Sequence, residues 1–313
     1  MKLLLLSSLS SSLFAGLILS FVTTTCGFCS VGMIAWVVTA SHSAKACGGP
    51  QFMWSPLRRH VNNRVFLSLS LAPPRKLLSE VVLDAEERKL FEMLKKVVGE
   101  REGGGAEGII LRVAGGWVRD KLLNVEGKND IDITVNKMSG KDFAEMLNRR
   151  FVKEGKPALK FGVIKENPEK SKHLETVAIN IGPFAVDFSN LRTENYTESS
   201  RVPLTSTGTP EEDASRRDLT INSLYYNINT GIVEDYTGNG INDLKLGLIR
   251  TPLPSLVTLR DDPLRALRAI RFACRFQFKI VEELLDACSD SGVRKSLHVK
   301  VSRERIKMEV EVF

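Results

Sequence analysis

The first 79 residues contain no aspartate or glutamate, whereas the whole sequence of 313 residues holds 37 of them against 44 lysines and arginines. This acid-free segment carries seven of the basic residues, and removing those seven leaves 37 basic and 37 acidic residues in the remainder. The net charge of +7 therefore belongs to the N-terminal segment. It gives no reason to expect that the rest of the chain attracts a polyanion through its overall charge.

Cysteine is scarce as well, with five in the chain, and no second pair accompanies the CxxC spacing of Cys26 and Cys29. Because a structural zinc site takes four ligands, this lack argues against a zinc or redox role. Cys274 and Cys288 lie in helical patterns and are predicted to be small core residues. The sequence GxxxxGK[ST] is also missing, which excludes a P-loop.

The N-terminal segment carries two kinds of targeting signal. Residues 3–22 form an apolar, serine-rich run, and residues 44–46 read Ala-Lys-Ala, as at a secretory cleavage site. Residues 53–76 are instead rich in arginine and serine, which is typical of an organellar transit peptide, and Met53 offers an internal start. We predict that residues 1–79 are a disordered targeting segment removed on import into mitochondria. The plastid, cytosol and nucleus are further destinations, and the secretory pathway is the lesser alternative.

Hydrophobic periodicity beyond this segment predicts a mixture of strands and helices, which indicates an α+β fold with a helical C-terminal section. The predicted helices cover 80–99, a stretch from 117, 141–151, a stretch beyond 215 and most of 261–313. The predicted strands cover 109–114, 131–135, 174–181, 183–188 and a hairpin around 229–231.

Two aspartates alternate with isoleucines in the segment 129–133. Successive side chains of a strand point to opposite faces, so Asp130 and Asp132 share one face while the isoleucines enter the core. Two neighbouring carboxylates repel each other unless a divalent cation bridges them, and Mg²⁺ takes oxygen ligands while keeping positions for water and phosphate. The motif predicts a catalytic Mg²⁺ site, and a solvated strand edge is the alternative that it leaves open.

A third carboxylate, Asp187, alternates with apolar neighbours in a predicted strand. It is a candidate to complete the metal site and to help deprotonate an attacking 3′-hydroxyl. A polar residue at a strand end is the alternative.

Gly115 and Gly116 stand where a predicted strand gives way to a helix. Glycine lets the backbone approach a phosphate closely, and the helix N-terminus offers unpaired N–H groups. Arg119 then supplies a fork for phosphate oxygens. A simple tight turn is the alternative for this segment.

The segment 216–222 reads Arg-Arg-Asp-Leu-Thr-Ile-Asn. Arg217, Asp218 and Asn222 are candidate contacts to the triphosphate and ribose of a nucleotide. A solvated helix start is the alternative for its paired arginines.

Three arginines recur every third residue after an Asp-Asp-Pro sequence at 261–263, which is typical of a helix start. Asp262 can accept a hydrogen bond from an exocyclic amino group, and Arg265 can donate to ring acceptors, so the pair can mimic a Watson–Crick edge for cytosine or adenine. Arg268 and Arg271 extend the same face. A surface helix with a cationic stripe is the alternative.

In this order, the motifs GGxVRD, DxD, RRDxTxN and DDxxRxxRxxRF resemble those of class II tRNA nucleotidyltransferases of the polymerase-β superfamily, and residues 186–196 are similar to the eukaryotic branch. The resemblance covers roughly residues 108–310. It implies a nucleotidyltransferase head at 80–250, with a mixed sheet flanked by helices, and the start of a helical neck at 251–313.

The resemblance also implies that the chain uses Mg²⁺, adds CMP and AMP from CTP and ATP to the 3′ end of tRNA, and has no stable membrane association. The implied residues are Asp130 and Asp132 for the metal, Gly116, Arg119 and Arg217 for the nucleotide, and Asp262, Arg265, Arg268 and Arg271 as an amino-acid template.

Two other functions stay open at this point. A poly(A) polymerase of the same superfamily would share these motifs and use ATP only, and a non-catalytic RNA-binding fragment would retain the fold alone. Residues 301–310 resemble the family's next motif, a helix that braces the template helix. Because the chain stops at Phe313, we expect it to be C-terminally truncated and weakly active on tRNA. The sequence does not predict an oligomeric state.

Overall fold

The computed structural model describes residues 75–99, 108–125, 129–164, 176–197 and 200–311. Residues 1–74, with the Cys26–Cys29 pair and the predicted cleavage site, lie outside this part. The last residues of the predicted targeting segment, 75–79, are described. The backbone N–H of Arg75 donates to the carbonyl oxygen of Lys245 at 2.8 Å.

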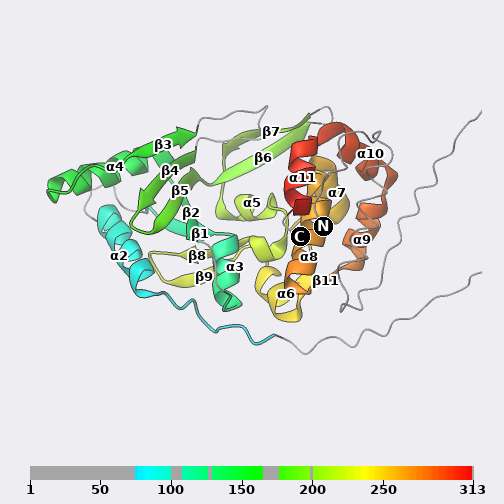
Figure 1. Cartoon of the computed structure of the whole chain (residues 1–313), viewed down its shortest axis with the longest axis horizontal. Coiled ribbons are helices and arrows are strands. Elements are labelled where there is room, and N and C mark those ends of the chain that lie inside the picture. Colours follow the sequence, from blue (N-terminus) through cyan, green and yellow to red (C-terminus); the bar gives the residue numbers. More distant parts are fainter. Residues whose placement is uncertain (1–74, 100–107, 126–128, 165–175, 198–199, 312–313) are drawn as a thin grey trace, which may run out of the picture. The chain divides into compact units, whose positions relative to one another are not determined.

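A seven-stranded mixed sheet organises the first part of the described fold (Figure 1). Strands β2 and β5 are parallel neighbours, and the other adjacent pairs of this sheet are antiparallel. Across the sheet the order is β3 (Phe161–Ile164), β4 (Thr176–Ile181), β5 (Phe184–Asn190), β2 (Asp130–Val135), β1 (Leu111–Ala114), β8 (Leu224–Asn227) and β9 (Ile232–Asp235). The predicted α+β fold with a mixed sheet flanked by helices is confirmed.

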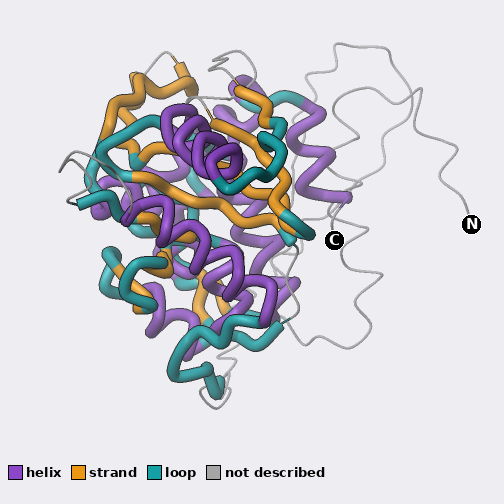
Figure 2. Tube along the Cα trace, turned by 90° about the vertical axis from the view of Figure 1, so that its left-hand side faces the viewer, coloured by secondary structure: helices purple, strands orange, loops and turns teal. Residues whose placement is uncertain are grey.

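Three helices cover one face of this sheet, namely α2 (Ala85–Gly99), α3 (Gly116–Leu122) and α4 (Gly140–Lys153). Figure 2 shows helices packed alongside the strands. The ring of Phe143 in α4 lies 4.9 Å from that of Phe188 in β5, and the ring of Phe91 in α2 lies 5.8 Å from that of Tyr226 in β8. Because the side chains of a strand alternate, the neighbours of Phe188 and Tyr226 point to the other face of the sheet.

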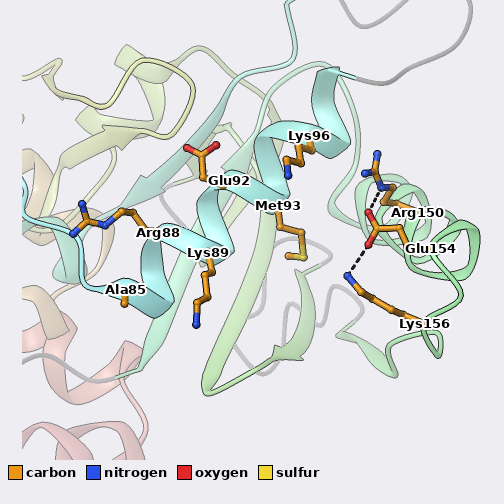
Figure 3. A pocket seen from close by; sticks show the side chains of 9 residues that line it. All are labelled: Ala85, Arg88, Lys89, Glu92, Met93, Lys96, Arg150, Glu154 and Lys156. Atoms are coloured by element: carbon orange, nitrogen blue, oxygen red, sulfur yellow. Dashed lines mark hydrogen bonds and ion pairs between the residues drawn. The ribbon is translucent and has the colours of Figure 1, made fainter.

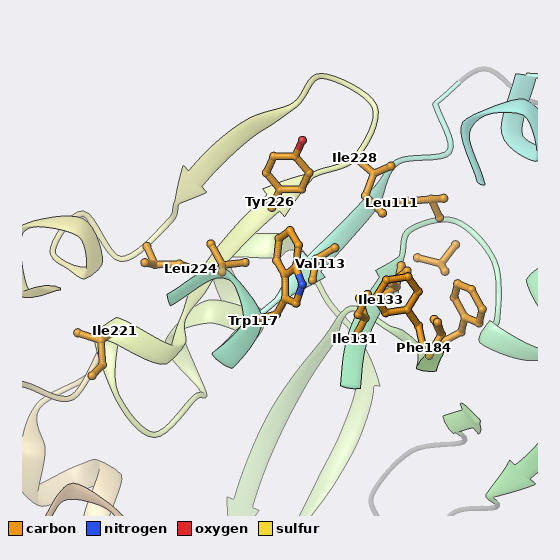
Figure 4. Close-up of a cluster of buried hydrophobic side chains, with 14 of the residues drawn as sticks. Leu111, Val113, Trp117, Ile131, Ile133, Phe184, Ile221, Leu224, Tyr226 and Ile228 are labelled. Carbon is orange, nitrogen blue, oxygen red and sulfur yellow. The ribbon is translucent and has the colours of Figure 1, made fainter. Parts of the chain in front are cut away.

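Buried side chains of the strands and of α3 form the core on the helix-covered face. Figure 4 shows Val113, Trp117, Ile131 and Ile133 gathered there. Ile131 and Ile133 are 1% and 0% exposed, as the alternation around the two aspartates predicts. The hydrophobic core continues from the sheet into the C-terminal helices, where Leu259 and Leu284 are fully buried.

The C-terminal part is mainly helical, as predicted. Its elements are α6 (Gly240–Leu246), β10 (Leu248–Ile249), α7 (Ser255–Asp261), α8 (Leu264–Phe276), β11 (Lys279–Ile280), α9 (Glu282–Ser289), α10 (Ser291–Lys300) and α11 (Arg303–Glu311). Strands β10 and β11 pair in parallel. Across the described ranges, none of the helices combines the length and the apolar character needed to cross a membrane.

The prediction of a helix beyond residue 215 is wrong. The helix of this region, α5 (Pro210–Ser215), lies before that point, and only the short 3₁₀ helix η2 (Thr220–Asn222) follows it. Helix α5 begins with a capping box, because the Thr209 hydroxyl accepts from the backbone N–H of Glu212 and the Glu212 side chain accepts from that of Thr209.

Two further differences concern strands and a cysteine. The antiparallel ribbon of β6 (Arg192–Thr197) and β7 (Ser200–Thr207), together with β3, was not predicted, whereas the hairpin of β8 and β9 was. Cys274 is exposed on α8, so its predicted core position is wrong, while Cys288 is partly buried and packs against the core.

Candidate functional site

The predicted carboxylates lie on the face of the sheet opposite the helices. Parallel pairing of β2 with β5 places Asp132 directly beside Asp187, and Asp130 beside Ala185. Asp130 and Asp132 are exposed and Asp187 is half-buried. The structure therefore brings the three predicted carboxylates to one sheet face, in adjacent strands about 4.8 Å apart.

The electrostatics of these carboxylates favour a cation. Desolvation by surrounding protein atoms raises the pKa of Asp132, Arg217 acts against this rise, and the charges of Asp187 and Asp130 add to it. Desolvation, followed by the charge of Asp130, also raises the pKa of Asp187. Like charges held together in this way are relieved when a divalent ion binds, and carboxylate oxygens are the ligands that such ions prefer.

Among the described residues, no group of three or more His, Cys, Asp and Glu side chains is arranged to hold one metal ion. The binding of a divalent ion by Asp130 and Asp132 stays a prediction. The role of Asp187 as a third ligand stays a prediction.

The glycine turn lies at the start of α3. Gly115 adopts φ +75° and ψ −124°. A Cβ atom there would lie 3.1 Å from Nη1 of Arg217, whereas one on Gly116 would meet Arg119 at an ordinary 3.5 Å. Of the two positions, only 115 therefore requires glycine, because of its positive φ and the nearby side chain of Arg217.

We expect Gly115→Ala to lower the free energy of unfolding by about 1–3 kcal/mol, because alanine is strained at positive φ. Gly116→Ala, in the first turn of the same helix, is the matched control and should leave this free energy unchanged or slightly raised. Urea denaturation followed by circular dichroism measures both. Equal losses in the two variants would show that the turn is not strained as described.

Arg119 is enclosed by protein. Its side chain donates to Asp120 at 2.8 Å and to the side-chain oxygen of Asn222, and its guanidinium lies 5.0 Å and 4.7 Å from the ring centroids of Phe272 and Phe276. With 3% of the residue exposed, burial lowers its pKa. The predicted phosphate contact of Arg119 stays a prediction, since it requires these contacts to open.

Arg217 faces the glycine turn and carries two contacts that the sequence analysis missed. Its Nη2 donates to Asp213 at 3.0 Å and its Nε to the hydroxyl of Tyr225 at 3.1 Å. The spacing of four residues between Asp213 and Arg217 is typical of a helical ion pair and could have indicated the first contact. Tyr225 has no comparable local signal.

Asp218 connects the turn after α5 to α8. Its carboxylate accepts from Arg268 at 2.7 Å and from the side chain of Asn222 at 3.1 Å. Burial acts to raise the pKa of Asp218, but Arg268 and Asn222 lower it to about 2. Asp218 and Asn222 therefore contact each other, and Asp218 also contacts α8.

The predicted template side chains also pair within the protein. Asp262 accepts from Arg305 of α11 at 2.9 Å, and Nη2 of Arg265 donates to the carbonyl oxygen of Arg216 at 2.7 Å. Glu309 of α11 accepts from Arg268 at 3.2 Å and from Arg271 at 2.6 Å. The arginine stripe of α8 is thus held against the turn at residues 216–218 and against α11.

A pocket of about 720 Å³ lies elsewhere, between α2 and the C-terminal end of α4 (Figure 3). Five basic and two acidic side chains line it, and Glu154 pairs there with Arg150 at 2.5 Å and Lys156 at 2.6 Å. Because α2 and α4 cover the sheet face opposite Asp132, this pocket is separate from the candidate site.

The mixed sheet, the paired aspartates of β2 and the glycine turn define a polymerase-β-like nucleotidyltransferase head. Residues 111–250 match the family described as the poly A polymerase head domain. The mitochondrial CCA tRNA nucleotidyltransferase of Saccharomyces cerevisiae is 51% identical over 209 residues, covering 66% of this chain and 38% of that protein.

The mitochondrial CCA tRNA nucleotidyltransferase of Candida glabrata is 46% identical over 241 residues, covering 75% of this chain and 45% of that protein. A solved CCA-adding enzyme in an apo form matches with a TM-score of 0.60 and 29% identity over 73% of this chain and 49% of that one. The chain belongs to the tRNA nucleotidyltransferase family, on its eukaryotic branch. It spans less than half the length of these two curated relatives.

Proposed function

We propose that the chain carries the nucleotide-adding site of an enzyme that transfers CMP and AMP from CTP and ATP to the 3′ end of tRNA, with Mg²⁺ as its metal. The observation that carries the proposal is the row of Asp132 and Asp187 on one sheet face, with Arg217 and the glycine turn beside it. The names of the two curated relatives support the choice of tRNA as acceptor.

In this proposal Asp130 and Asp132 hold the ion through their carboxylate oxygens. When bound, Mg²⁺ neutralises the charge that develops on the transferred phosphoryl group. Asp187 accepts the proton of the 3′-hydroxyl while the 3′-oxygen forms a bond to the α-phosphorus of the nucleotide. The bond from that phosphorus to the pyrophosphate leaving group breaks. Arg217 and the N–H groups at the start of α3 hold the triphosphate.

The base is read at the N-terminal end of α8, by Asp262 just before the helix and Arg265 in its first turn. Asp262 accepts from the exocyclic amino group of cytosine or adenine, and Arg265 donates to the adjacent unprotonated ring nitrogen, a combination that the Watson–Crick edges of uracil and guanine do not offer. Because Asp262 also accepts from Arg305, the base shares or replaces that partner on binding.

We further propose that the protein acts in mitochondria. The acid-free N-terminal composition supports this, as do the names of both curated relatives, which include the word mitochondrial.

The test is nucleotide addition to tRNA that lacks its three terminal residues, with the protein in excess over the tRNA. We expect CTP alone to add two CMP residues, ATP alone to add none, and both together to complete CCA. Addition of AMP without CTP would instead support the poly(A) polymerase alternative. The matching family is described by the head domain of that enzyme. No addition under any condition would support a non-catalytic fragment.

A further inference from the structure

A buried ionic cluster around Asp213 of α5 lies next to the candidate site. Asp213 is 0% exposed and accepts from Nε of Arg216 at 2.9 Å, from Nη2 of Arg217 at 3.0 Å and from the hydroxyl of Tyr225. Burial acts to raise the pKa of Asp213, but Arg217 and Arg216 outweigh it and hold this pKa well below its usual range. The cluster therefore keeps an ionised carboxylate in the protein interior.

The register of the sheet places this cluster on the same face as the metal-site carboxylates. Tyr225 pairs with Ala114 of β1, and the next residue, Tyr226, packs against Trp117 on the helix-covered face. Tyr225 therefore points to the opposite face, the one that carries Asp132. A fully buried tyrosine on a strand that is paired on both sides gives Asp213 a rigid anchor.

Asp213 binds one edge of the Arg217 guanidinium. Nε and Nη2 of Arg217 lie 3.3 Å and 3.0 Å from the same carboxylate oxygen. A guanidinium is planar, so fixing this edge also fixes the direction of Nη1. Nη1 lies 3.1 Å from the position that a Cβ atom of Gly115 would take, and it therefore points to the glycine turn.

Asp213 also holds Arg216, and the main chain of Arg216 contacts α8. The carbonyl oxygen of Arg216 accepts from Nη2 of Arg265 at 2.7 Å, while its side chain is paired with Asp213. One buried carboxylate thus fixes the arginine beside the glycine turn and the loop that contacts α8.

We propose that Asp213, together with Tyr225, is a positioning residue that sets Arg217 against the glycine turn so that it receives the triphosphate of the incoming nucleotide. The proposal rests on the proposed function, in which Arg217 holds the triphosphate. Its consequence is that weakening the cluster impairs nucleotide binding in the ground state and the transition state alike.

The test compares Tyr225→Phe and Asp213→Asn with Tyr236→Phe in the nucleotide-addition assay. Tyr236 packs against Tyr225 with ring centroids 5.7 Å apart, but its hydroxyl donates to Glu234 at 2.8 Å, so it is a matched control for loss of a hydroxyl. We expect KM for CTP and ATP to rise about tenfold or more in Asp213→Asn and roughly three- to tenfold in Tyr225→Phe. The kcat should stay within about twofold of wild type, because uniform binding is lost.

A merely structural role gives the reverse pattern, in which kcat falls with the folded fraction and KM stays constant. That pattern, or a Tyr225→Phe variant with the same KM as Tyr236→Phe, overturns the proposal. Should Asp213→Asn not fold, Tyr225→Phe carries the test, since it keeps the ring and the carboxylate. A wild-type protein that neither binds nor uses CTP would contradict the proposed function itself, which separates the two failures.

Discussion

Asp132→Asn is expected to lower the rate of nucleotide addition on the order of a thousandfold, because positioning of the divalent ion contributes several kcal/mol to stabilisation of the transition state. The same change should not unfold the protein. The pKa of Asp132 is raised in the folded state, so its ionised form opposes folding at neutral pH, and asparagine removes that charge. The midpoint of thermal unfolding should stay constant or rise slightly.

A suitable control is Glu86→Gln on α2, the helix on the opposite sheet face. Glu86 is an exposed acid paired with Lys89 at 2.7 Å, so its loss changes the net charge by the same amount without touching the site. Single-turnover rates at saturating Mg²⁺ and CTP measure both variants. An Asp132→Asn protein as active as Glu86→Gln would exclude Asp132 from the metal site.

Asp262→Ala is expected to relax the choice of base more than it weakens nucleotide binding. Losing one well-placed base contact costs about 1–3 kcal/mol of discrimination, which is roughly 5- to 150-fold in the ratio of kcat/KM between CTP and UTP. The measurement is that ratio for wild type and variant on the same tRNA.

Arg305→Ala distinguishes base recognition from a structural role of Asp262. Arg305 donates to Asp262 at 2.9 Å from α11, so its removal frees the carboxylate without deleting it. We expect Arg305→Ala to change kcat/KM for CTP and UTP by the same factor. If both variants relax base choice equally, Asp262 acts by holding α11 in place, and the template role is wrong.

Local patterns predicted the parts of the site that depend on strand alternation. The alternation around Asp130 and Asp132 is a period of two, and it is enough to place both carboxylates on the face opposite the core. The glycine turn follows from a residue type that tolerates positive φ. Such features need only a few neighbouring residues, and the structure agrees with them.

Local sequence patterns gave the wrong position for α5. The segment after Ser215 was predicted as a helix, although Thr209, Pro210 and Glu212 form a stronger start signal upstream. The capping box satisfies backbone donors at Thr209, so the helix begins there and ends before Arg217.

Partners distant in sequence could not be predicted from the pattern. The stripe of arginines on α8 required acceptors, but Glu309, which contacts Arg271, lies 38 residues further along the chain. Arg119 likewise ends against the ring of Phe272 on α8 rather than at an open surface. The exposure of Cys274 depends on which face of α8 is buried, and its local spacing did not determine that face.

The central claim is that the aspartate pair of β2 holds the divalent ion, and Mn²⁺ binding in the presence of CTP tests it most directly. Electron paramagnetic resonance of the free ion gives the affinity without requiring tRNA or turnover. We predict that wild type binds Mn²⁺ and that Asp130→Asn and Asp132→Asn each weaken this binding at least about tenfold, with unfolding midpoints no lower than wild type. Unchanged Mn²⁺ affinity in both variants would contradict the account.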